Sequence, residues 1–189
     1  MYSRSFDNMY ILGDYINYFS LEGVPWLVLA WVSMYASRSL ATLIHEIGHL
    51  IPTLFFTHGP VSINVGERPF YKNIIGRCEF HISFKSPLIG YVSFQEQRLC
   101  LTRKVSILLA GPILSLLTVI IVPVIISECA LFIWLEVLLA GFFCSNLLCF
   151  LRSVLPFYLR ATEACPKGVP SDSLQIIKLL NEGARMKKS

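Results

Sequence analysis

Three long apolar stretches and one alternating segment organise the chain. The apolar stretches run from Val24 to Phe56, from Val105 to Ser127 and from Ala130 to Leu151. Each approaches or exceeds the roughly 20 residues that a helix needs to cross a bilayer core of about 30 Å. The pattern therefore predicts an all-α multi-pass membrane protein with three core transmembrane helices, 24–56, 105–127 and 130–151.

The segment between the first two helices, residues 57–97, has a different pattern. The stretches "VSINV", "CEFHISF" and "IGYVSF" alternate between apolar and polar residues, and glycines and prolines separate them. Such alternation between turn residues predicts a short antiparallel hairpin or a small sheet. After the third helix, prolines interrupt the chain until a helical pattern begins near Ser171, where Ser171 or Asp172 would cap the helix.

Composition supports a membrane location. Of the 189 residues, 54% are hydrophobic and only 15% are charged, which is far from the average of soluble domains. We expect an N-terminal interfacial segment (1–23), a membrane core (24–180) and a basic tail (181–189). The acidic, aromatic start does not match a cleavable signal, so we expect the first helix to be retained.

The charges predict an orientation. Residues 1–23 contain one basic residue, Arg4, and three acidic ones, whereas segments 57–104 and 152–189 are rich in lysine and arginine. The positive-inside rule then places the N-terminus outside, with the sheet and the C-terminus on the cytosolic side, and we expect the cell membrane. Because the basic residues are divided between segments, the net charge of +4 indicates a lipid bilayer as partner and no nucleic acid.

The six cysteines show no C-x-x-C pair and no regular framework. We interpret all six as small apolar residues that fill space, and not as zinc ligands or disulfide partners. They are Cys78, Cys100, Cys129, Cys144, Cys149 and Cys165.

The sequence "HEIGH" (45–49) stands out within the first apolar stretch. His45 and His49 are one helical turn apart, so both imidazoles can bind one Zn²⁺ ion, while Glu46 can act as the base for a water on that ion. Ionisable groups inside a membrane segment are costly, and by default they mark functional sites. This cost favours a metal site over a chance coincidence.

A catalytic zinc site needs a third protein ligand and one open position. The extended motif with a third histidine would need glycine at 52 and histidine at 55, where the chain has Pro52 and Phe55. Glu67 and Glu79 are alternatives within the predicted hairpin region. Asp172 lies on the same cytosolic side at the start of a helix, in the segment 166–180, and we prefer it as ligand over a role as a simple N-cap.

Four stretches together resemble the site-2 protease family of intramembrane zinc metalloproteases: "HEIGHL", "LLAGPILS", "SNLLCFLRSVLP" and "VPSDSLQI". The resemblance implies that His45, His49 and Asp172 bind one Zn²⁺ ion and that Glu46 is the catalytic base. It also implies that Asn146, in the matching Asn-Leu element, contacts the substrate backbone or the oxyanion.

The resemblance extends over about residues 27–180. Gly111 and Pro112 match the family's middle motif, and "PLIGYVSF" resembles its membrane-associated hairpin. Ser115 stands where many members have asparagine, Ser173 stands where glycine is usual, and the spacing from Asn146 to Asp172 is longer. The length leaves no room for a PDZ or other regulatory domain, so we expect a minimal member.

The expected function is zinc-dependent hydrolysis of a peptide bond in or near a membrane segment of a precursor or membrane-tethered protein. The alternative is a non-catalytic membrane assembly protein that keeps the scaffold, although Glu46 would then have no use. A metal transporter would need ionisable residues in several helices, and outside the motif only Arg38 and Glu136 lie within them. Arg38 either lines a substrate path or marks a helix break at "SRS" (37–39).

Overall fold

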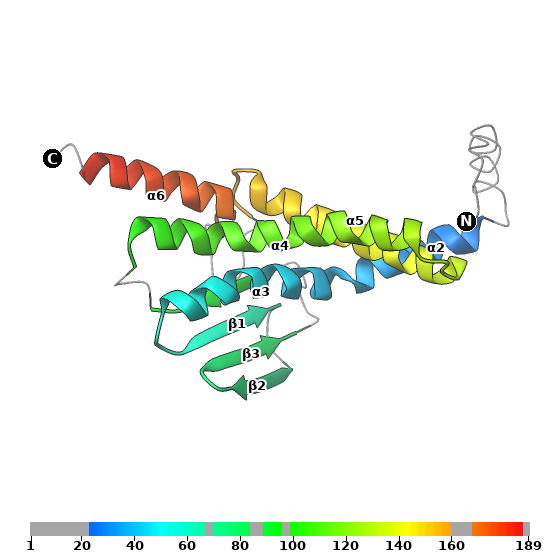
Figure 1. Cartoon of the computed structure of the whole chain (residues 1–189), viewed down its shortest axis with the longest axis horizontal. Coiled ribbons are helices and arrows are strands. Elements are labelled where there is room, and N and C mark those ends of the chain that lie inside the picture. The colour runs from blue at the N-terminus through cyan, green and yellow to red at the C-terminus, as the bar shows by residue number, and fades with distance from the viewer. Residues whose placement is uncertain (1–22, 67–69, 84–88, 96–98, 160–167, 187–189) are drawn as a thin grey trace.

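Five helices and one small sheet make up a computed structural model of the chain, which describes residues 23–66, 70–83, 89–95, 99–159 and 168–186. The helices lie side by side in an elongated bundle, and the sheet lies against one side of it (Figure 1). The predicted N-terminal segment 1–23 falls almost entirely outside these residues. In chain order the helices are α2 (Val24–Ala36), α3 (Arg38–Phe56), α4 (Leu101–Glu128), α5 (Ile133–Val154) and α6 (Asp172–Met186).

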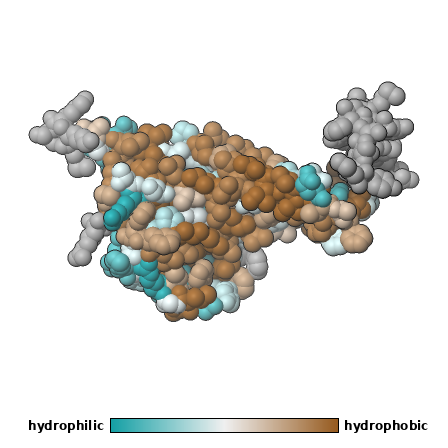
Figure 2. Space-filling model, viewed as in Figure 1, coloured by the Kyte–Doolittle hydropathy of each residue, from teal (hydrophilic) through white to brown (hydrophobic). Residues whose placement is uncertain are grey.

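Three helical segments are long and apolar enough to cross a membrane: Val24–Phe56, Leu101–Glu128 and Ile133–Val154. The first matches the predicted stretch, and the other two begin and end within a few residues of the predicted bounds. Large hydrophobic side chains remain exposed along α2, α4 and α5, and the visible face of the bundle is mostly hydrophobic (Figure 2). A soluble protein rarely exposes so much apolar surface, which is compatible with a lipid environment.

The first span consists of two helices. Helix α2 ends at Ala36, α3 begins at Arg38, and Ser37 lies between them. The predicted break at "SRS" is therefore present. The Arg38 guanidinium lies over the Tyr35 ring, 5.1 Å from its centroid, and is thus held by an aromatic face across the break.

The predicted small sheet is present, with four strands: β1 (Val61–Val65), β2 (Tyr71–Ile75), β3 (Cys78–Ile82) and β4 (Gly90–Ser93). Their spatial order is β2-β3-β1-β4. Strands β2 and β3 form an antiparallel hairpin, and β4 is antiparallel to β1. The parallel pairing of β1 with β3 was not predicted, because alternation along a strand does not specify the direction of its neighbour.

The sheet is anchored to α3 through the buried face of β1. Val61, Ile63 and Val65 are buried and form one hydrophobic cluster with Leu50 of α3. Because side chains alternate along a strand, these three residues lie on the face toward the helix. This packing also brings the edge strand β4 alongside α3, next to the predicted catalytic segment.

Helices α3 and α4 approach closely at Gly48. A Cβ atom added there would lie 2.6 Å from the carbonyl oxygen of Ala110 and 2.8 Å from the Cα of Gly111, so a larger residue would force the two helices apart. Helix α6 packs mainly on α4. It continues to Met186, so the predicted basic tail (181–189) begins within a helix.

Candidate metal centre

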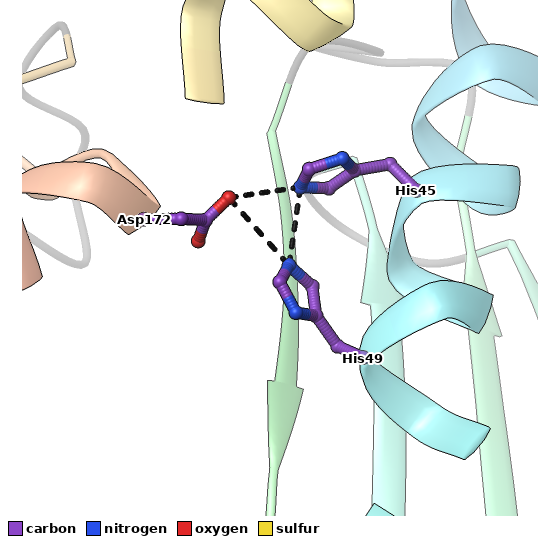
Figure 3. Close-up of side chains that lie close together, drawn as sticks. All are labelled: His45, His49 and Asp172. Atoms are coloured by element: carbon purple, nitrogen blue, oxygen red, sulfur yellow. Dashed lines mark hydrogen bonds and ion pairs between the residues drawn. The ribbon is translucent and has the colours of Figure 1, made fainter. Parts of the chain in front are cut away.

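The side chains of His45, His49 and Asp172 meet at one point, although Asp172 lies more than 120 residues after the histidines in the chain (Figure 3). The histidines project from consecutive turns of α3, and Asp172 is the first residue of α6. The two Nε2 atoms are 3.1 Å apart. The Asp172 Oδ2 atom is 3.1 Å from Nε2 of His45 and 3.6 Å from Nε2 of His49.

These separations suit one tetrahedral metal ion. Zinc bonds of about 2.0–2.1 Å to nitrogen and oxygen place any two ligands about 3.3 Å apart. The three separations in the structure lie on both sides of that value. Two imidazoles and one carboxylate are also a donor set that Zn²⁺ accepts in catalytic sites, where the fourth position stays open for water. The residues therefore fit the metal that the motif predicts.

The other ring nitrogens are held by α4. The His49 Nδ1 atom is 2.7 Å from the carbonyl oxygen of Ile107, which can only accept a hydrogen bond, so Nδ1 carries the proton. The His45 Nδ1 atom is 3.0 Å from the Ser115 hydroxyl oxygen, and Ser115 is fully buried. Such partners fix the orientation of metal-binding histidines and leave the Nε2 lone pairs available to the ion.

Gly111 makes room for one of these rings. A Cβ atom at this position would overlap the imidazole of His49. The glycine in "AGP" thus has a local physical reason, since a side chain at this position would collide with the His49 ring.

Asp172 is free to bind metal because Ser171 takes over the cap of α6. The Ser171 hydroxyl donates to the Leu155 carbonyl oxygen at 2.7 Å, and the Leu174 amide donates to that hydroxyl at 3.4 Å. Just before α6, the Leu159 amide donates a hydrogen bond to the Val169 carbonyl oxygen, which holds the chain that leads into this helix. Burial works to raise the pKa of Asp172, but its close contacts with His45 and His49 outweigh burial and lower the pKa to about 2, so the carboxylate is charged.

Glu46 lies in a cavity of about 370 Å³ that the three candidate ligands also line. The residue is buried, and a Cβ atom at Gly90 of β4 would overlap its Oε1 atom and come within 2.7 Å of Thr42 Cγ2. The edge strand therefore rests directly on the carboxylate. Residues of α5 and α6 line the same cavity, including Cys149, Arg152 and Gln175.

The other predicted candidates lie elsewhere. Asn146 is fully buried and does not line the cavity; its Nδ2 atom donates to the Phe142 carbonyl oxygen, and its Oδ1 atom has no hydrogen-bond partner among the described residues. Glu79, on β3, is 3.8 Å from Nε2 of His81 and does not line the cavity of the histidine pair. Glu67 lies outside the described residues.

Sequence reasoning missed three contributors to the site. In the sequence, Ser115 is only a departure from the family motif, Gly90 only a residue of the alternating stretch "IGYVSF", and Arg152 only one of the basic residues of segment 152–189. The position of each side chain depends on the rotation of its helix or strand, and spacing along the chain does not reveal that rotation.

Comparisons of the chain with profiles of known protein families, with curated proteins and with solved structures found no match.

Proposed function

We propose that the protein is a zinc-dependent endopeptidase that hydrolyses a peptide bond in or next to a membrane segment, as its resemblance to the site-2 protease family implies. The observation that supports this most is the meeting of Asp172 with the histidine pair of a His-Glu-x-x-His helix, at separations that suit a tetrahedral ion. A chance histidine pair would have no reason to lie beside a distant carboxylate.

Each residue then has a defined role. His45, His49 and Asp172 hold one Zn²⁺ ion, and Ser115 with the Ile107 carbonyl keeps the two rings oriented. A bound Zn²⁺ ion would supply Lewis acidity there: it would lower the pKa of a water from about 15.7 toward 7 and would polarise the substrate carbonyl. Glu46 would take a proton from the attacking water and pass it to the leaving amine.

The surroundings suit a membrane substrate. The motif lies within the apolar segment Val24–Phe56, and residues of α3, β4, α4, α5 and α6 line the cavity. A peptide bond within a helix is shielded by its own hydrogen bonds, so the substrate must be extended near the cleavage point. A membrane-anchored precursor that unwinds locally meets both requirements.

The test compares membranes from cells that express wild type, Glu46→Gln or Glu79→Gln. Both changes convert one carboxylate to an amide, but Glu79 is on β3 and outside the cavity. Quantitative mass spectrometry should find a membrane-anchored protein that wild type and Glu79→Gln deplete and that Glu46→Gln retains. If wild type and Glu46→Gln membranes have the same protein content, the hydrolase proposal is wrong and the assembly role is favoured.

A further inference from the structure

The cavity beside Glu46 contains a cation for which the proposed hydrolysis has no role. Arg152 lies in the last turn of α5 and lines the cavity together with Cys149, three residues earlier on the same helix. Its side chain is half-buried. A guanidinium that leaves water pays a desolvation cost unless an anion or hydrogen-bond acceptor receives it.

Within the described residues, no carboxylate forms an ion pair with Arg152. Its charge acts on Glu46 and Asp172 at longer range, but Asp172 is engaged by the two histidines and Glu46 rests against Gly90. Two other cations line the cavity, Lys178 and Lys104. The Lys178 Nζ donates to the Tyr158 hydroxyl at 2.8 Å, and Lys104 also has an interaction partner. The guanidinium of Arg152 is thus the cavity cation best able to accept a new anion.

Two simpler explanations account for the position of Arg152 but not for its direction. A basic residue in the last turn of a helix interacts favourably with the helix dipole. A long basic side chain near the end of a membrane helix can also extend toward the aqueous boundary. Both explanations would hold equally for a side chain that faces away from the protein, whereas Arg152 lines the cavity that contains Glu46.

We propose that Arg152 is a specificity residue that binds a carboxylate of the peptide in this cavity, close to the bond that is cleaved. The planar guanidinium can donate two parallel hydrogen bonds to one carboxylate, and such pairs are strong where water is partly excluded. The carboxylate can belong to an aspartate or glutamate side chain or to the free C-terminus of the peptide. This inference rests on the proposed function, because it names the substrate class of the same site.

The experiment measures binding of labelled peptides to the purified protein in detergent, with Glu46→Gln present throughout to stop turnover. Three fluorescent peptides of alanine and leucine serve as probes: one with a central glutamate and an amidated end, one with glutamine and an amidated end, and one with glutamine and a free C-terminal carboxylate. Fluorescence anisotropy gives each dissociation constant. The variants Arg152→Gln, Arg152→Lys and Arg103→Gln are measured in the same background.

We expect at least one acidic peptide to bind about tenfold more tightly than the neutral amide, and the peptide that does so identifies the source of the carboxylate. Arg152→Gln should abolish this preference, and Arg152→Lys should keep part of it. Arg103→Gln is the matched control, because it removes the same charge from an exposed position against Phe56, outside the cavity. A purely structural role for Arg152 would lower the melting temperature without changing the preference.

Equal affinities for all three peptides would overturn the inference, and so would a preference that survives in Arg152→Gln. Failure of both acidic peptides to bind up to about 1 mM would also contradict it. Binding is measured on a variant that cannot turn over, so the result is independent of hydrolysis. An acidic preference without any Glu46-dependent processing in cells would refute the proposed protease and leave the Arg152 site standing.

Discussion

Ser115 provides the sharpest test of how the histidine pair is held. Its hydroxyl oxygen lies 3.0 Å from His45 Nδ1, and the residue is fully buried in α4. Changing Ser115 to alanine removes this partner and leaves the ring nitrogen buried without a replacement. The His45 ring then loses the contact that directs its Nε2 atom toward His49 and Asp172.

Two independent estimates give the size of the effect. A buried polar group that loses its hydrogen-bond partner costs about 1–3 kcal/mol. Removing a group that orients a metal-binding histidine typically costs about 10–100-fold in metal affinity, or about 1.4–2.7 kcal/mol. The two ranges overlap, so we expect Ser115→Ala to weaken zinc binding by about 10–100-fold.

The assay is competition for zinc against a chromogenic chelator, with purified protein in detergent. Ser106→Ala is the matched control, since Ser106 is an exposed serine on the same helix whose hydroxyl bonds to the Thr102 carbonyl. It should bind zinc as wild type does. If Ser115→Ala also binds zinc with unchanged affinity, the hydroxyl does not orient His45 and the reasoning is refuted.

Three further predictions concern other parts of the site. Asp172→Ala should lose zinc, as measured by elemental analysis. Glu182→Ala, which changes another cavity carboxylate on α6, should keep a full equivalent of zinc under the same conditions. Equal zinc contents in the two variants would exclude Asp172 as a ligand. Gly90→Ala should keep zinc but lower the turnover number at least about tenfold, because the added Cβ displaces the Glu46 carboxylate. Gly59→Ala is the control: a Cβ there has no neighbour closer than 3.5 Å, so the turnover number should be unchanged. Equal turnover in the two glycine variants would show that strand β4 does not position Glu46. Ser171→Ala should lose about 1–2 kcal/mol of stability, because it removes the cap of α6 and a buried hydrogen bond, and an unchanged thermal midpoint would contradict that role.

The sequence predicted those parts of the fold that depend on local pattern. Long apolar runs identified the three membrane-length helical segments, the first of which consists of two helices, and the alternation in 57–97 identified the sheet. Helix bounds shifted by a few residues, because a helix can continue through polar residues at the end of an apolar run, as α4 does at Thr102, Arg103 and Lys104. The parallel partner of β1 was missed, since the strand pattern fits either direction of its neighbour.

The same distinction between local sequence pattern and tertiary packing applies to the candidate site. The i and i+4 spacing of His45 and His49 is a local property of one helix, so the sequence alone places the two rings together. Asp172 is indicated by its predicted side of the membrane, by its place at a helix start and by the family resemblance, none of which gives its position in space. Its distance from the histidines depends on how α6 packs on α4, and its availability depends on the cap that Ser171 provides. Ser115 and Arg152 depend on helix rotation, which no sequence spacing encodes.

The most direct test of the metal centre is X-ray absorption at the zinc edge of the purified protein. Ligation by His45, His49 and Asp172 predicts one zinc per chain, with only nitrogen and oxygen neighbours at about 2.0–2.1 Å and the outer-shell scattering of two imidazoles. A sulfur neighbour at about 2.3 Å would instead indicate a thiolate, for which Cys149 in the same cavity is the candidate. That result, or a protein that binds no zinc, would contradict the proposed centre.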